Sequence, residues 1–165
     1  MASRLDYLLG CRLPPARLSE ADGGEVATLD ALALLGKGRV VVAGAPEAAG
    51  PVEYGHYLRS LIVHAGRLRA TGVDEIVCIV TSDALSVEAW AKSIDPSRRV
   101  RFLSDADLEF ARALDLIAPG AGDRSEPYML ILQNGMIRTA RLERLAAATG
   151  STGRIGADNS FMLDA

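Results

Sequence analysis

The stretches RVVVAG (residues 39–44) and EIVCIVT (residues 75–81) decide the fold class of this sequence. Both are short, rich in β-branched residues and almost free of polar side chains, which is typical of strands buried on both faces of a sheet. Between them, apolar side chains recur at steps of three and four residues from Tyr54 to Leu68, as on one face of a helix. Pro51 fits the first turn of this helix and Gly72 fits its end. The order strand, helix, strand predicts an α/β fold with parallel strands joined by a right-handed crossover.

The sequence that follows predicts a second helix, a third strand and a third helix. The aspartate that opens residues 83–93 is a suitable N-cap for a helix over that range. A strand is expected at residues 100–103. Ser104 and Asp107 resemble a capping box at the start of a helix that ends near Leu116.

The strongest local prediction is a β-hairpin. The stretches YMLILQ (residues 128–133) and MIRTAR (residues 136–141) flank Asn134-Gly135, the dipeptide preferred in two-residue hairpin turns. Residues 118–127 form a loop by composition, and a short closing helix anchored at Asp158 is expected in the tail.

Composition limits the class of protein. The 165 residues, 49% hydrophobic and 24% charged, are enough for one globular domain that spans residues 1–165. With 18 basic and 21 acidic residues interspersed, and a net charge of −3, neither a nucleic acid nor a membrane is expected as a partner. No apolar run approaches the length of a membrane span, and the first residues lack the order of a secretory signal, so the cytoplasm is the expected compartment.

Read in order, these pieces resemble the peroxiredoxins, and within them the atypical two-cysteine, redoxin-domain branch. The likeness runs from about Leu9 to the C-terminus and is strongest in GVDEIVCIVTSDALSVEAW (residues 72–90) and VRFLSDADLEFARALDL (residues 100–116). The resemblance implies a thioredoxin-like fold: a central mixed β-sheet flanked by helices, with a C-terminal β-hairpin. It also implies a homodimer.

The resemblance further implies a reactive site that this sequence does not complete. The family motif Pro-x-x-x-Thr/Ser-x-x-Cys, set on Pro46, places its hydroxyl residue at Gly50 and its reactive (peroxidatic) cysteine at Glu53. A family arginine that contacts the peroxide falls on Pro127, although Arg124 lies three residues upstream. A thiolate reduces a peroxide by giving up electrons and becoming a sulfenate, which a carboxylate cannot do. No catalytic set is therefore intact.

Two cysteines remain, and neither has metal or redox-motif spacing. Cys78 falls inside a predicted buried strand, where a thiol acts as a small apolar group. Cys11 is expected near the edge of the sheet, partly exposed and without an activating base. Both are most simply explained as incidental thiols.

Glu53 allows two interpretations. As a carboxylate at a helix N-terminus it is stabilising as a capping charge alone. Alternatively, it holds a fixed negative charge where relatives hold a thiolate, in a pocket that a partner recognises. Tyr54 could line that pocket or the dimer face, and the loop at residues 118–127, which contains Arg124, is a plausible docking segment.

No cofactor or metal is expected. Glu53 and His56 resemble half of a carboxylate-histidine site, but His64 is rotated away from His56 around the helix. The glycine-rich stretches do not have phosphate-loop spacing. The sequence therefore favours a non-catalytic peroxiredoxin homologue with a binding, regulatory or assembly role. The alternative is residual thiol-dependent oxidoreductase or peroxidase activity through Cys11 or Cys78.

Overall fold

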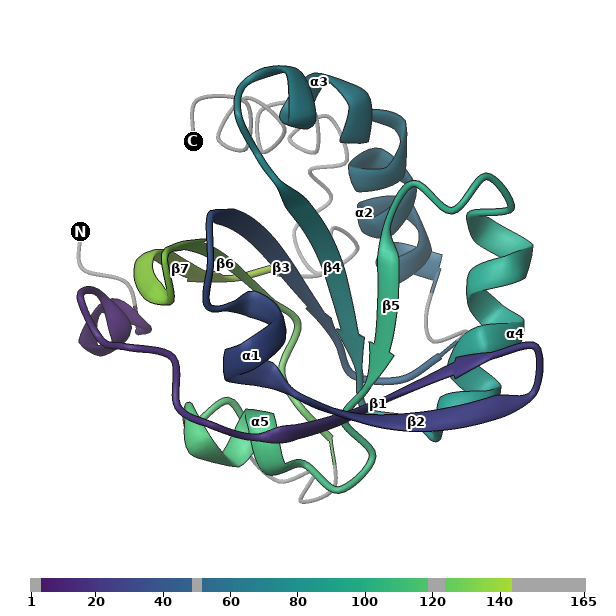
Figure 1. The fold of residues 1–165 in the computed structure, drawn as a ribbon, viewed down its shortest axis with the longest axis horizontal. Helices are drawn as coiled ribbons and strands as arrows, with labels where there is room; N and C mark the ends of the chain where they lie inside the picture. The colour runs from purple at the N-terminus through teal and green to yellow at the C-terminus, as the bar shows by residue number, and fades with distance from the viewer. Residues whose placement is uncertain (1–3, 49–51, 119–123, 144–165) are drawn as a thin grey trace.

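A mixed seven-stranded sheet, in the order β2-β1-β5-β4-β3-β6-β7, forms the centre of the molecule (Figure 1). The structure is a computed structural model that describes residues 4–48, 52–118 and 124–143, without the side chains of residues 52–57. The strands are β1 (Arg17–Asp22), β2 (Glu25–Asp30), β3 (Arg39–Ala45), β4 (Glu75–Val80), β5 (Arg101–Ser104), β6 (Tyr128–Gln133) and β7 (Met136–Leu142). The helices are η1 (Asp6–Leu8), α1 (Ala31–Leu35), α2 (Val52–Val63), α3 (Ala65–Ala70), α4 (Ala84–Ile94) and α5 (Glu109–Ala113).

The predicted buried strands lie in the middle of this sheet. β3 and β4 are parallel, with Val42 opposite Val77, and β5 continues the parallel set on the far side of β4. β6 pairs antiparallel with the other edge of β3. The predicted mixed sheet flanked by helices is confirmed. Both faces of β3 and β4 are covered, which explains why these strands are continuous β-branched runs.

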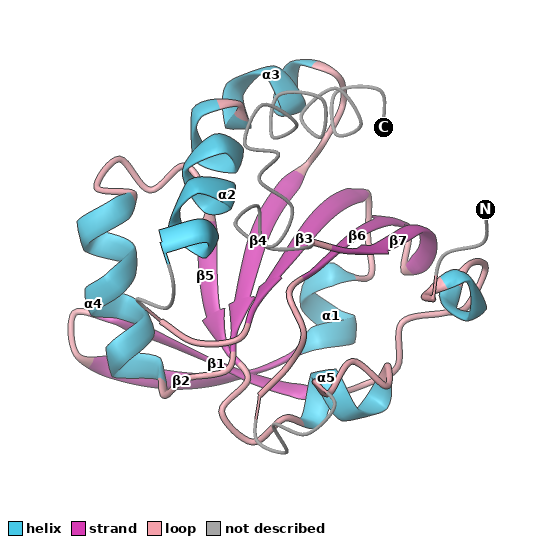
Figure 2. Ribbon diagram, turned by 180° about the vertical axis from the view of Figure 1, so that it is seen from behind, coloured by secondary structure: helices cyan, strands magenta, loops and turns pink. Residues whose placement is uncertain are grey.

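Helices lie on both faces of the sheet (Figure 2), and each face has its own hydrophobic core. Val41 and Cys78 point to the face covered by α2, α3 and α4, where Leu61 and Trp90 join them. Alternate residues, such as Val42, point to the opposite face, which α1, α5 and the N-terminal segment cover. This alternation follows from the period of two along a strand.

The long predicted helix is divided into α2 and α3. His64, with φ −93° and ψ 4°, lies outside the α-helical region and separates them, and its Nδ1 lies 2.8 Å from the carbonyl oxygen of Ser60. The apolar side chains Leu58 and Leu68 are nevertheless buried as the periodicity predicts. Gly72, with φ +106°, ends the segment as expected.

The predicted capping box at Ser104 and Asp107 is wrong. β5 ends one residue later than expected, so Ser104 belongs to the strand and its hydroxyl donates to the carbonyl of Ser82. The carboxylate of Asp105 instead accepts from the N–H groups of Phe110, at 3.1 Å, and Ala111, at 2.9 Å. The adjacent aspartate therefore caps α5.

The C-terminal hairpin is confirmed. Asn134 and Gly135 both have positive φ, 49° and 79°, as a type I′ turn requires. The Asn134 side chain also accepts from the N–H of Gly38 at 2.9 Å, which ties the turn to the start of β3. The closing helix expected at Asp158 lies outside the described residues.

The hairpin of β1 and β2 is an element that the sequence did not predict. Its turn is made by Gly23 and Gly24, with φ +62° and +87°. β2 is exposed along almost its whole length, so its sequence lacks the apolar alternation that marks a half-buried strand. Among the residues described, no helix is both long and apolar enough to traverse a bilayer.

Candidate functional site

The candidate site lies where the parallel strands end. β3 ends at Ala45, the buried Pro46 follows, and the chain begins α2 at Val52. Glu53 is therefore in the first turn of α2, where the resemblance places a reactive cysteine. The side chains of Glu53 and Tyr54, and all of Gly50, lie outside the described residues.

Hydroxyl groups hold the loops around this site together. The N–H of Ala48 donates to Ser82 Oγ at 2.9 Å, which joins the loop after β3 to the loop after β4. The N–H of Ser125 donates to Thr81 Oγ1 at 3.2 Å, and this hydroxyl in turn donates to Ser125 Oγ at 3.2 Å. The segment before β6 is thus bound at the same end of the parallel strands, where β3 and β4 finish.

Arg124 reaches the site from this segment. Its Nη1 lies 3.1 Å from Glu47 Oε1, one residue after Pro46. Pro127, at the position of the family arginine, is half-buried, and its carbonyl accepts from the N–H of Glu143 at 2.8 Å. The cation predicted near the site is present, but it is paired with a carboxylate.

Two buried polar residues, Tyr128 and Asp105, lie next to strand ends: Tyr128 opens β6 and Asp105 directly follows β5. The Tyr128 ring packs directly on Gly44 and stacks on Phe110 with a centroid distance of 6.5 Å. Its hydroxyl has no hydrogen-bond partner among the described residues, and burial, reinforced by the charge of Asp105, raises its pKa. Burial also raises the pKa of Asp105, from 3.8 to about 6, against the lowering effect of its two backbone hydrogen bonds.

The two cysteines lie away from the start of α2. Cys78 is fully buried in the middle of β4, and burial raises the pKa of its thiol. Cys11 is exposed, and its thiol lies 3.4 Å from the carbonyl of Tyr7. It is held at the edge of the sheet, where its carbonyl accepts from the N–H of Ile137. The predicted burial of Cys78 and exposure of Cys11 are confirmed.

The described residues contain no cluster of three or more His, Cys, Asp or Glu side chains able to hold a metal ion. The ring of His64 faces the carbonyl of Ser60, in the last turn of α2. The side chain of His56 lies outside the described residues.

Sequence reasoning missed several residues that shape the site. Glu47, the partner of Arg124, is far from it in the sequence and carries no motif. Thr81 was assigned to the end of a strand and Ser82 was given no role, yet their hydroxyls bind neighbouring loops. The signal available was the run of three polar residues, Thr81 to Asp83, directly after a buried strand.

The sheet order, the helix that starts after β3 and the buried proline before it define a thioredoxin-like protein. A family profile described as Redoxin matches residues 9–150. This chain belongs to the peroxiredoxin family.

Similar proteins agree with this assignment. Peroxiredoxin-2E-2, chloroplastic, of Oryza sativa subsp. japonica is 34% identical over 87% of this chain and 68% of its own length. Peroxiredoxin-2C of the same plant is 31% identical over 82% of this chain and 86% of its own. The crystal structure of reduced Prx3 in complex with H2O2 from Vibrio vulnificus is 32% identical, with a TM-score of 0.75, and the match covers 82% of this chain and 87% of that one.

Proposed function

We propose that this chain is a non-catalytic peroxiredoxin homologue that acts as a binding, regulatory or assembly protein. The observation that supports this most directly is Glu53 in the first turn of α2. A thiolate there would be stabilised by the helix N-terminus and would attack a peroxide oxygen. A carboxylate in the same place gains the same electrostatic stabilisation, but the peroxide cannot oxidise it as it oxidises a thiolate sulfur to a sulfenate.

The remaining thiols are poorly placed to substitute. Cys78 is buried in β4, where burial keeps its thiol protonated. Cys11 lies beside Ile137, near the end of the sheet where β3 begins, whereas α2 follows the end of β3. At about 3.3 Å per residue, the length of β3 separates these two ends by roughly 20 Å.

The other positions of the family motif also support the loss of peroxidase activity. Gly50 has no hydroxyl group to bind a peroxide, and Pro127 has no positively charged side chain. Arg124 is near the site, but its guanidinium is paired with Glu47. Of the motif residues, Pro46 alone is retained.

We further propose a homodimer, in line with the family, in the cytoplasm. In this assembly Glu53 supplies a fixed negative charge at the mouth of the inherited pocket. The segment that carries Arg124, and Tyr54 on the first turn of α2, are the proposed contacts for a protein partner. Purification of the tagged protein from its native source, with and without Glu53→Gln, tests this role. A partner that is retained by the wild type and lost from the variant supports it, and equal retention contradicts the role of Glu53.

A gain-of-function test addresses the proposed loss of activity. The triple variant Glu53→Cys, Gly50→Thr, Pro127→Arg should consume hydrogen peroxide with a thiol reductant, and Glu53→Cys alone should do so more slowly. The difference arises because the added hydroxyl and guanidinium orient the peroxide and stabilise the developing charge. A folded triple variant without activity would contradict the placement of the site.

The second candidate function is thiol-dependent peroxidase activity, and the exposure of Cys11 is the observation that favours it. If it holds, the wild type turns over peroxide and Cys11→Ser abolishes the turnover. Cys78→Ser serves as the matched control with a buried thiol. Loss of turnover in Cys78→Ser instead would assign the chemistry to the Cys78 thiol in β4.

A further inference from the structure

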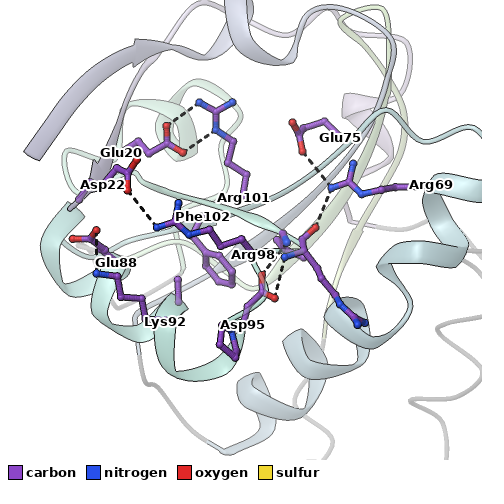
Figure 3. Close-up of a pocket in the computed structure, with 15 residues that line it drawn as sticks. Glu20, Asp22, Arg69, Glu75, Glu88, Lys92, Asp95, Arg98, Arg101 and Phe102 are labelled. Carbon is purple, nitrogen blue, oxygen red and sulfur yellow. Dashed lines mark hydrogen bonds and ion pairs between the residues drawn. The ribbon is translucent and has the colours of Figure 1, made fainter. Parts of the chain in front are cut away.

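A cavity of about 260 Å³ lies in the corner between the β1–β2 hairpin, α4 and β5 (Figure 3). It exists because β1 and β5 pair only at Ser19 and Ser104 and then diverge. None of its lining residues belongs to the site at the start of α2.

The floor of the cavity is an aromatic ring held in a fixed position. Phe102, half-buried on β5, lines the cavity together with Ala91 of α4. The ring of Trp90, which is 9% exposed, contacts Phe102 edge to face, with centroids 5.9 Å apart and an interplanar angle of 78°. A ring supported in this way offers a preformed apolar surface to a flat ligand.

Three of the five acidic side chains that line the cavity are already engaged. Glu88 accepts from the N–H groups of Gly23 and Gly24, at 2.6 and 3.3 Å, which fixes the hairpin turn on α4. Asp95 accepts from the N–H groups of Arg99 and Val100, at 3.0 and 2.9 Å. These carboxylates shape the two rims and have little capacity left for a ligand.

A third carboxylate is engaged by an arginine. Glu20 receives both hydrogen bonds of the Arg101 guanidinium, each 2.8 Å long, across the gap between β1 and β5. A two-bond pair of this kind is geometrically specific and is not readily given up to a ligand.

Two cations, in contrast, keep free donors. Arg98 makes one contact of 3.3 Å with Asp22, and both side chains are more than 70% exposed, so the pair is weak. Lys92, 59% exposed, lies 3.5 Å from Glu88. Arg98 extends toward Asp22 in Figure 3. Asp22 stays as exposed as Arg98, but Glu20, Glu88 and Asp95 have their acceptors occupied. With the available donors of Arg98 and Lys92 beside them, this part of the cavity favours an anion over a cation.

We propose that this cavity binds a small organic anion with a flat body. The body packs on Phe102, and its carboxylate or phosphate group accepts hydrogen bonds from Arg98 and Lys92. The volume suits a single ring with one charged group, since it is below the range of drug-sized pockets. This binding site is independent of the proposed loss of peroxidase activity.

Titration of the ¹⁵N-labelled protein, followed by NMR, tests the proposal with four probes: benzoate, phenyl phosphate, inorganic phosphate and benzylamine. Benzoate or phenyl phosphate should bind with a Kd of about 1 mM or below and shift the amide signals of Phe102 and Arg98. Benzylamine, with the same ring and the opposite charge, should bind at least tenfold more weakly. The better aryl anion identifies the preferred charged group, and inorganic phosphate should bind more weakly than phenyl phosphate.

Variants locate the site. Arg98→Gln and Lys92→Gln should each weaken binding of the better probe at least fivefold. The matched controls are Arg138→Gln, exposed on β7 at the other edge of the sheet, and Lys37→Gln, the other lysine of the sequence. Both controls should leave the Kd unchanged. Equal binding of benzylamine, shifts confined to other residues, or unchanged affinity in Arg98→Gln would each overturn the proposal, as would a Kd above 10 mM for both aryl anions.

Discussion

Arg124 and Glu47 form an ion pair of 3.1 Å that joins the segment before β6 to the loop after β3. These two segments border the start of α2, so the pair lies beside the position where the family reacts with peroxides. Arg124, three residues upstream of Pro127, where the resemblance places the family arginine, is thus directed to a carboxylate.

The pair should contribute little to stability. The side chains of Arg124 and Glu47 are 48% and 40% exposed, and exposed ion pairs contribute about 0–1 kcal/mol. A double-mutant cycle with Glu47→Gln and Arg124→Gln, measured by urea unfolding, should give a coupling energy in this range that falls at high salt. A coupling above about 2 kcal/mol that is insensitive to salt would show that the pair is more strongly held than its exposure indicates.

The two thiols should differ sharply in reactivity. Cys11 is exposed and Cys78 is fully buried, so a disulfide reagent such as DTNB should modify one thiol per native chain and two after unfolding in guanidinium. Cys11→Ser should remove the fast phase, whereas Cys78→Ser should retain it. Rapid modification of Cys78 in the native protein would contradict its position in the core.

Asp105 should make stability depend on pH. Its pKa rises from 3.8 to about 6 on folding, chiefly because it is buried. The native state therefore binds this proton more tightly than the unfolded state, so the contribution of Asp105 is greatest below pH 4 and is lost as the pH rises to about 6. The change is about 3 kcal/mol over that interval.

Urea unfolding between pH 3.5 and 7.5 measures this effect, with Asp105→Asn as the reference, because the amide does not titrate. The unfolding free energy of the wild type minus that of the variant should fall as the pH rises through this window and stay constant above about pH 7. A carboxyl NMR titration of Asp105 with a midpoint near 4 would refute the assignment.

Gly44 should not tolerate a side chain. A Cβ at this position would collide with the ring of Tyr128, which is fully buried between Gly44 and Phe110. Gly44→Ala should lower the free energy of unfolding by about 1–3 kcal/mol or more. The control is Gly66→Ala on α3, where a Cβ meets nothing within 4 Å, and it should stabilise the protein by about 0.5–1 kcal/mol. A neutral Gly44→Ala would mean that Tyr128 can move aside.

The predictable part of the fold is the part where burial determines the sequence. β3 and β4 are covered on both faces, so their β-branched runs identify them. The Asn134-Gly135 turn is equally readable because both residues need positive φ. The N-terminal hairpin was missed since β2 packs on its neighbour mainly through the backbone and leaves its side chains in solvent.

The site was predictable only where a motif spans consecutive residues. The resemblance to the family motif assigned Pro46 and Glu53, and the structure puts Glu53 in the first turn of α2. The pairing of Arg124 with Glu47 depends on how two loops meet and has no local signal. The cavity floored by Phe102 was equally hidden, because it arises from the divergence of two strands that are distant in the sequence.

The most direct test of the proposed loss of activity is the reaction of the unmodified, fully reduced protein with hydrogen peroxide in a stopped-flow instrument, followed by mass spectrometry. We predict no fast phase, and only slow oxidation at Cys11 that Cys11→Ser eliminates, because Glu53 has no thiol to oxidise. Rapid, stoichiometric conversion of a cysteine to a sulfenate, with turnover when a thiol reductant is added, would contradict the proposal.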